Sequence, residues 1–316
     1  MSVHAAVGDR SQEAVATAER SAWLRAIGAI GGAVLSNRKA LIGAIILLVF
    51  ILMAVLAPLI SPYSLSDNSA LPMAPPSAAH RLGTTSLGQD ILTQLIYGTR
   101  QSLLIAFVAG LAATIISMLI GVTSAYRGGT TDHILSLVTD IFLVLPQLPL
   151  MIVIAAYFKG GSVWVLIGVI VVTGWAFGAR QLRAQALSLR NRDFLEAARI
   201  RGERSSYIIV FEILPTMISL IVANFLGAAL YAVLAAAGLQ FIGLGNVDDV
   251  SWGTMLYWAE NNEAMMAGAP LWTLAPGICI ALLGASFALL NYAFDELGNP
   301  ALRRVRRKRG RRVVNS

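Results

Sequence analysis

Residues 190–202 read Arg-Asn-Arg-Asp-Phe-Leu-Glu-Ala-Ala-Arg-Ile-Arg-Gly, a charged island between two long apolar segments. Asp193 is of a residue type that caps helix N-termini, and Glu196 follows at the three-residue spacing of a capping box. Gly202 can adopt the left-handed conformation that ends a helix. The pattern predicts a helix of about two turns, which is too short to be stable alone in water. Such a helix needs tertiary support, which a docked protein could supply.

Composition places the chain among membrane proteins. Of its 316 residues 57% are hydrophobic and only 13% are charged, and the mean hydropathy is +0.70. Soluble domains carry about 25% charged residues. The net charge of +7 does not indicate nucleic-acid binding, because the basic residues flank apolar runs: 8 of the 24 lie after residue 302 and 7 between 180 and 204. That distribution favours anchoring at a membrane surface.

Six apolar segments approach the ~20 residues that a helix needs to span a bilayer. They cover residues 40–60, 103–125, 134–158, 161–177, 213–242 and 271–294. The predicted fold is an all-α integral membrane protein with six transmembrane helices and both termini on one side. Residues 1–38 would precede it, with an interfacial or cytosolic helix at 23–35, and a basic tail would follow at 303–316. Pro146 and Pro149 are expected to kink the third span.

The connecting segments set the predicted orientation. The termini, the 126–133 loop and the island at 178–212 together hold 21 of the 24 Lys and Arg, so the positive-inside rule places them in the cytoplasm. The opposite segments are the polar stretch 61–98, the short turn near Lys159 and the loop 243–269. That last loop holds four acidic residues and no Lys or Arg. Its acidic residues are Asp248, Asp249, Glu260 and Glu263.

The chain lacks the sequence motifs of several classes of enzyme. It has no Gly-Lys dipeptide and therefore no Walker A loop, and no Gly-x-Ser-x-Gly or His-Glu-x-x-His motif. Its three histidines fall in three separate segments, without metal-ligand spacing, and its one cysteine, Cys279, lies in an apolar run. The chain is therefore not expected to be an enzyme, to bind a cofactor or metal, or to bind nucleic acid.

Polar residues within the spans are candidate functional positions. Asp140 lies in the third span, where an ionisable group is costly. It is interpreted either as a structural partner, for instance of an arginine of the island, or as part of a gate. Four other residues are interpreted either as lining a pathway or as forming hydrogen bonds between helices; these are Asn224, Tyr231, Gln240 and Asn291. Five tryptophans are interpreted as anchors at the membrane interface; they are Trp164, Trp175, Trp252, Trp258 and Trp272.

The island also carries a family resemblance. Glu196-Ala197-Ala198, Gly202 and Glu212-Ile213-Leu214-Pro215 resemble the EAA loop of ABC-importer permeases. Residues 38–302 are similar to the C-type subunit of dipeptide and oligopeptide permeases, with matching motifs in order. The motifs are His80-Arg81-Leu82-Gly83-Thr84, Leu87-Gly88-Gln89-Asp90, Tyr97-Gly98-Thr99-Arg100-Gln101-Ser102-Leu103, Phe241-Ile242-Gly243-Leu244-Gly245, Ser251-Trp252-Gly253-Thr254-Met255-Leu256, Ala275-Pro276-Gly277 and residues 291–300.

The resemblance implies a type I ABC-importer permease of the bacterial plasma membrane that moves di- or oligopeptides. The helix over 193–202 would couple it to an ATPase subunit, where ATP and Mg²⁺ would bind. The coupling residues would be Asp193, Glu196, Ala197, Ala198, Arg199, Arg201, Gly202, Leu214 and Pro215. Implied partners are a homologous permease, two ATPase domains, an extracytoplasmic binding protein and lipids. The Gly- and Ala-rich fifth span would approach the partner permease closely.

Other cargoes and a different class stay open at this stage. Relatives of this branch also carry nickel, glutathione or haem, and a non-transporting scaffold or channel that recruits a regulator through the island is the alternative. The chain departs from the family near its outer loops. Thr85 and Gln89 stand where the family usually has Asp and Arg, Ala236 stands near a usual acidic position, and residues 247–250 read Val-Asp-Asp-Val where prolines are usual.

Overall fold

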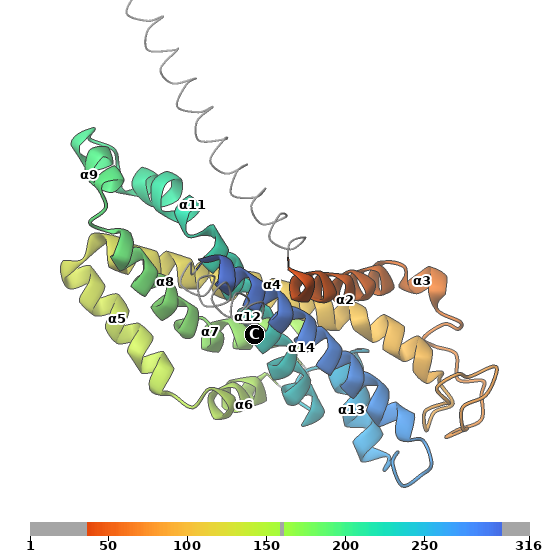
Figure 1. Cartoon of the computed structure of the whole chain (residues 1–316). Helices are drawn as coiled ribbons and strands as arrows, with labels where there is room; N and C mark the ends of the chain where they lie inside the picture. The colour runs from red at the N-terminus through yellow and green to blue at the C-terminus, as the bar shows by residue number, and fades with distance from the viewer. Residues whose placement is uncertain (1–36, 159–160, 299–316) are drawn as a thin grey trace, which may run out of the picture.

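A computed structural model describes residues 37–158 and 161–298, with side chains up to residue 294. The predicted helix at 23–35 and the basic tail at 303–316 lie outside the described residues. The described chain is helical, apart from loops and an isolated bridge between Thr84 and Asp90. Figure 1 shows an elongated bundle with helix α9 (Asp193–Ile200) at one end and helix α13 (Trp252–Asn261) at the other. We refer to these as the α9 end and the α13 end.

The first span agrees with the sequence. Helix α2 (Arg38–Val55) begins after Asn37, whose side-chain oxygen accepts a hydrogen bond from the N–H of Lys39 at 3.0 Å. A short helix, α3 (Ala57–Ile60), continues it to the α13 end. Together they cover the predicted residues 40–60.

The second span is longer than predicted. Helix α4 runs Ile91–Arg127 rather than 103–125, because Asp90 caps it by accepting the N–H of Thr93 at 2.7 Å. Its first turns are held by burial: Ile91, Leu95 and Ile96 are all less than 9% exposed. At 37 residues the helix is about 55 Å long, which exceeds the ~30 Å hydrocarbon layer.

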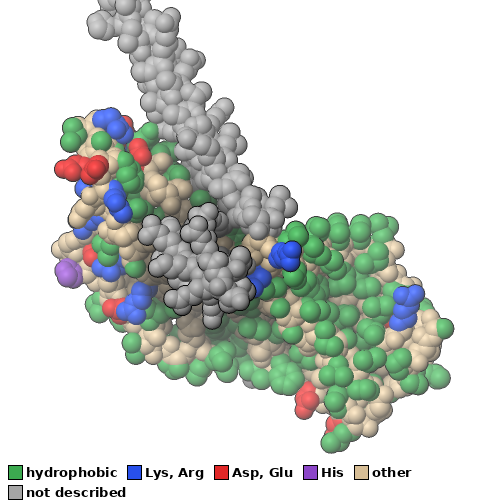
Figure 2. Space-filling view, viewed as in Figure 1, with side chains coloured by type: hydrophobic (Ala, Val, Ile, Leu, Met, Phe, Trp, Pro, Cys, Tyr) green, Lys and Arg blue, Asp and Glu red, His purple; other side chains and the backbone are tan. Residues whose placement is uncertain are grey.

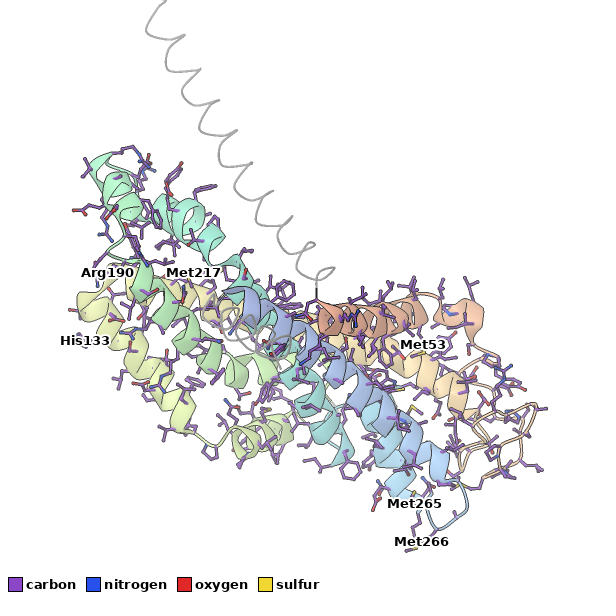
Figure 3. The ribbon with its side chains drawn as sticks, in the orientation of Figure 1. Met53, His133, Arg190, Met217, Met265 and Met266 are labelled. Atoms are coloured by element: carbon purple, nitrogen blue, oxygen red, sulfur yellow. The ribbon has the colours of Figure 1, made fainter. Side chains whose placement is uncertain are left out.

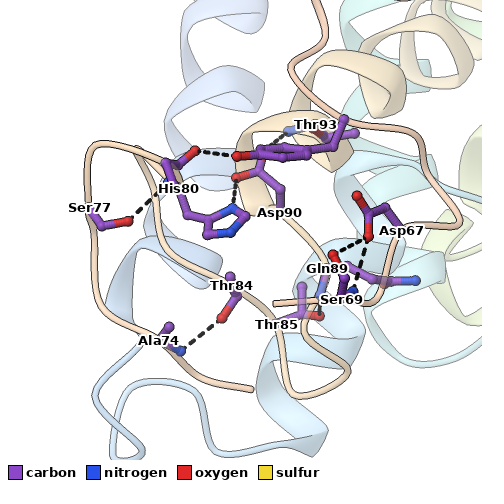
Figure 4. A network of polar contacts seen from close by, with 12 residues as sticks. Asp67, Ser69, Ala74, Ser77, His80, Thr84, Thr85, Gln89, Asp90 and Thr93 are labelled. Atoms are coloured by element: carbon purple, nitrogen blue, oxygen red, sulfur yellow. Dashed lines mark hydrogen bonds and ion pairs between the residues drawn. The ribbon is translucent and has the colours of Figure 1, made fainter. Parts of the chain in front are cut away.

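The segment between α3 and α4 folds against the start of α4 (Figure 4). The His80 Nδ1 lies 3.0 Å from Asp90 Oδ1, and the Thr84 hydroxyl donates to the Leu71 carbonyl at 2.6 Å. Between them Gly83 has φ +84°, a conformation that a side chain disfavours. The motif that begins at His80 is thus the local framework that closes this loop onto α4.

The third and fourth predicted spans each consist of two helices that meet at an angle. Helices α5 (Gly129–Val144) and α6 (Gln147–Tyr157) meet at 89°, at a break that contains Pro146. The predicted kink is therefore a full break in the helix. Helices α7 (Val163–Gly174) and α8 (Ala176–Leu189) meet at 44°. The predicted island at 178–212 is thus no simple loop, since its first part belongs to α8, where Leu182 is fully buried.

The last two predicted spans follow α9. A short helix α10 (Ser205–Tyr207), a π-helix η1 (Ile208–Ile213) and α11 (Leu214–Thr216) lead into α12 (Ile218–Phe241). After α13, helix α14 (Pro270–Gly298) completes the bundle. Four helices of the described chain are individually long and apolar enough to cross a membrane, and the number rises to six if each bent pair is one span.

The core surrounds α4, which packs against α2, α7, α8 and α12. Small residues permit the closest approaches: a Cβ atom built on Gly121 would lie 2.3 Å from the Ala179 carbonyl oxygen. Four alanines of the Gly- and Ala-rich stripe on α12 are buried within this chain; they are Ala229, which packs against Gly110 of α4, and Ala232, Ala235 and Ala236, which cluster with residues of α7. The expectation that this stripe faces a partner permease is therefore wrong for its buried members.

The tryptophans also differ from the prediction. Trp175, Trp252 and Trp272 are 5%, 0% and 3% exposed, so they are core residues and not interface anchors. The Trp252 indole N–H donates to the Leu95 carbonyl at 3.2 Å, which ties α13 to α4. Trp164 and Trp258 are exposed.

Candidate functional site

Helix α9 ends as the sequence predicts but begins differently. Its N-cap is Arg192, without a side-chain cap, and Asp193 is the first helical residue. The predicted capping box of Asp193 and Glu196 is therefore wrong. Both carboxylates nevertheless lie in the first turn, where their negative charge interacts favourably with the helix dipole. At the other end Gly202 has φ +77° and donates to the Arg199 carbonyl, while the Glu203 N–H donates to the Ala198 carbonyl. This is a Schellman motif.

The protein itself supplies part of the support that this short helix needs. Leu195 and Ala198 are fully buried, one turn apart on one face of α9. They belong to a hydrophobic cluster with Leu182 of α8 and with Ile208 and Ile213 of η1. The remaining face is exposed and includes Asp193, Glu196, Ala197, Arg199, Ile200 and Arg201. Of the two alanines of the motif, Ala198 packs inward and Ala197 faces outward.

Arginines connect α9 to its surroundings. The Arg199 guanidinium lies 5.3 Å from the centre of the Tyr126 ring on α4, and it donates to the Arg190 carbonyl at 3.2 Å. Arg201 lies 3.4 Å from a carboxylate oxygen of Glu212 on η1. Leu214 is buried where α11 starts, and Pro215 follows it. The predicted coupling residues thus form one continuous unit from α9 to the start of α12.

The α9 end is rich in arginines, with several carboxylates among them (Figure 2). Figure 2 shows basic side chains gathered there and few at the opposite end. Figure 3 labels Arg190 and His133 at this end, and Met265 and Met266 at the α13 end. The arginines of α8, α9 and their connections are Arg180, Arg183, Arg190, Arg192, Arg199, Arg201 and Arg204.

Two ion pairs join α5 to α8 at this end. Arg183 binds Asp132 through two contacts of 2.7 Å, and the Ser124 hydroxyl also donates to that carboxylate. Asp140 pairs with Arg180 at 2.8 Å, and both side chains are more than half exposed. A partner for Asp140 within the island is thus present, while its part in gating stays a prediction.

Three of the four predicted pathway residues meet in one central cavity. Asn224, Tyr231 and Asn291 line a space of about 550 Å³, whose walls come from α4 to α8, α12 and α14. Its polar lining also includes Ser117, Gln147 and Gln181, which the sequence reasoning missed. The Tyr231 hydroxyl is buried and has no hydrogen-bond partner among the described residues. No charged residue is among the described residues that line this cavity.

Gln240 has a different location. It is 3% exposed, and its side-chain oxygen accepts the Ser251 hydroxyl at 2.8 Å, which fixes the start of α13 to α12. Ser251 in turn accepts the N–H of Thr254, so a Ser-x-x-Thr capping box begins α13. The Ser251-x-x-Thr254 spacing is the sequence signal that could have revealed α13 within the predicted loop 243–269.

Comparison with known proteins gives consistent results. The family model "Binding-protein-dependent transport system inner membrane component" matches residues 113–297, more than half of the chain. A second model, "N-terminal TM domain of oligopeptide transport permease C", matches residues 34–76.

Named relatives match over most of their length. The chain is 33% identical to the dipeptide transport system permease protein DppC of Alkalihalophilus pseudofirmus over 269 residues, which cover 84% of this chain and 87% of the relative. It is 32% identical to the oligopeptide transport system permease protein OppC of Mycobacterium tuberculosis, with 86% and 94% covered. It is 33% identical to OppC of Bacillus subtilis, with 85% and 88% covered.

Proposed function

Because the chain belongs to the family of binding-protein-dependent transport system inner membrane components, we propose that it is the membrane subunit of an ATP-driven importer of di- or oligopeptides. The observation that carries the substrate class is the similarity to dipeptide and oligopeptide permeases over more than four fifths of the chain. The protein resides in the bacterial inner membrane as a multi-pass chain, consistent with its apolar helices.

The proposed topology has six spans, with each bent pair counted as one, and both termini in the cytoplasm. The arginine-rich α9 end then faces the cytoplasm, as the positive-inside rule requires. The acidic α13 end faces outward, where an extracytoplasmic binding protein delivers substrate. A homologous permease completes the pathway around the central cavity. Its uncharged amides and hydroxyls suit the hydrogen-bonding groups of peptide bonds.

Energy coupling is assigned to α9. One of two ATPase domains, each holding ATP and Mg²⁺, docks on the exposed face that includes Glu196, Ala197 and Ile200. The permease chain itself binds no cofactor and catalyses no reaction. Because Leu195 and Ala198 pack on α8 and η1, a displacement of α9 moves these helices with it. The two ion pairs between α5 and α8, at Asp132 and Asp140, join α5 to the same helix α8.

Two experiments test this proposal. A tagged chain, expressed with its neighbouring genes, should co-purify with a P-loop ATPase and a second permease, and absence of both overturns the importer assignment. Uptake of radiolabelled di- and tripeptides should require the chain in a deletion strain. Asn224→Leu should reduce this uptake without loss of the ATPase, whereas Leu274→Ala, at an exposed apolar position outside the cavity, should not.

A further inference from the structure

A second cavity lies at the α13 end, separate from the central one. It measures about 570 Å³, within the range of small-molecule sites. One wall comes from the loop before α4 and from α4, through Thr85, Gln89 and Gln94; the other comes from residues 247–258. The Gln101 side-chain nitrogen donates to Asp249 Oδ2 at 3.3 Å and so bridges the two sides. Its walls include Thr85, Gln89 and residues 247–250, where the sequence departs from the family pattern, but not Ala236.

The cavity carries an uncompensated negative charge. Asp248 and Asp249 line it, and no Lys, Arg or His is among its described lining residues. Within the described residues, the Asp249 carboxylate accepts hydrogen bonds only from two side-chain amides, those of Gln101 and Asn246. The Asp248 carboxylate is exposed and makes no hydrogen bond or ion pair with the described residues. Two neighbouring carboxylates without a cationic partner attract a cation.

The rest of the lining indicates what kind of cation fits. No group of three or more His, Cys, Asp and Glu comes together in the described part of the chain, as a metal site requires. Trp258 and Met255 supply apolar and aromatic surface instead. Trp272 also lines the cavity, and its buried indole N–H has no acceptor among the described residues. Carboxylates, aromatic rings and a free N–H donor match an organic ammonium ion that carries a carbonyl group.

We propose that this cavity binds the amino-terminal end of a peptide before the peptide enters the central cavity. The ammonium group of the peptide lies at Asp248 and Asp249, and its first carbonyl lies toward the indole N–H of Trp272. The inference rests on the proposed peptide import and adds a recognition site on the permease itself. It assigns charge recognition to the α13 end and leaves the uncharged central cavity to hold the backbone.

Direct binding separates this site from transport as a whole. The permease complex in lipid nanodiscs is titrated with Ala-Ala and with N-acetyl-Ala-Ala by equilibrium dialysis of the radiolabelled peptides. We expect the free-amine peptide to bind at least tenfold more tightly than the acetylated one. Asp248→Asn combined with Asp249→Asn should abolish this difference. Asp248→Asn alone should reduce it and leaves the hydrogen bonds of Asp249 in place.

Matched controls come from the same acidic region. Glu260→Gln and Glu263→Gln remove equal charge from α13 and the loop after it but do not line the cavity, so the tenfold preference should persist. Equal binding of the two peptides by the wild-type complex overturns the proposal. So does a wild-type preference in the Asp248→Asn, Asp249→Asn variant. If the Asp248→Asn, Asp249→Asn variant loses peptide uptake yet keeps the preference, the two carboxylates serve docking of the delivery protein. This outcome also overturns the proposal. Failure of the wild type to import peptides, in the separate uptake assay, counts against the proposed function instead.

Discussion

Leu195→Ala tests whether α9 is held by its own chain. The Leu195 side chain is fully buried against α8 and η1, and α9 has only eight residues, so this contact is a large part of its support. Truncation of a buried leucine costs about 2–5 kcal/mol. Since α9 lies at the surface and can settle into the vacated space, we expect a value near the lower end, about 2–3 kcal/mol.

That loss predicts a specific change in local opening. At about 1.4 kcal/mol per factor of ten, amide hydrogen exchange within α9 should accelerate about 30- to 140-fold. The exchange is measured by mass spectrometry on the nanodisc-embedded chain without ATPase, so that no docked protein protects the helix. Amides of α4 should be unaffected, because their helix is long and packed along most of its length.

Ile200→Ala is the matched control. It removes a similar apolar side chain from the same helix, but that side chain is 81% exposed. Exchange in α9 should change less than threefold, whereas ATPase binding should weaken. If Leu195→Ala leaves α9 exchange like that of Ile200→Ala, the chain does not hold this helix, and the ATPase must supply its whole stability.

Three further experiments probe other features. Gly202→Ala should destabilise α9 by about 1–2 kcal/mol, because its φ of +77° is strained for alanine, and the same exchange experiment would refute this by showing no change. A double-mutant cycle of Asp132→Asn and Arg183→Met should give a coupling energy of about 1–3 kcal/mol in unfolding of the purified chain, since the pair is bidentate and partly buried; a value near zero would contradict it. Trp252→Phe should lower stability by about 1–2 kcal/mol through loss of its bond to Leu95, and an unchanged melting temperature would show that this bond is dispensable.

Long apolar runs made the spans predictable, but helices that are held by packing were not. The first turns of α4 contain Gln94, Arg100 and Gln101, which lower the hydropathy and shifted the predicted start to residue 103. The Asp90 cap and burial of Ile91 hold those turns in the structure. Sequence shows the cap but not the surface that covers the helix. The same reason accounts for α8, whose arginines suggested a loop.

At the candidate site, local signals were partly sufficient. Gly202 ended α9 as its lack of a side chain predicts, but Asp193 did not cap it, because Arg192 takes the extended backbone of the N-cap position. The polar lining of the central cavity was found in part, through Asn224 and its neighbours within apolar runs. Gln181 was missed because it sits among arginines, where a polar residue carries no signal.

The uncharged lining of the central cavity has a consequence for turnover. A hydrogen bond between neutral groups contributes only about 0.5–1.5 kcal/mol net, whereas bonds to charged groups contribute about twice that. A substrate held by Gln147, Gln181 and Asn224 alone would therefore stay bound briefly and dissociate over a low barrier. A transport pathway that must release its substrate in every cycle gains speed from such weak binding. It would also tolerate peptides with varied side chains, because its lining holds no fixed charge that could bind one of them tightly.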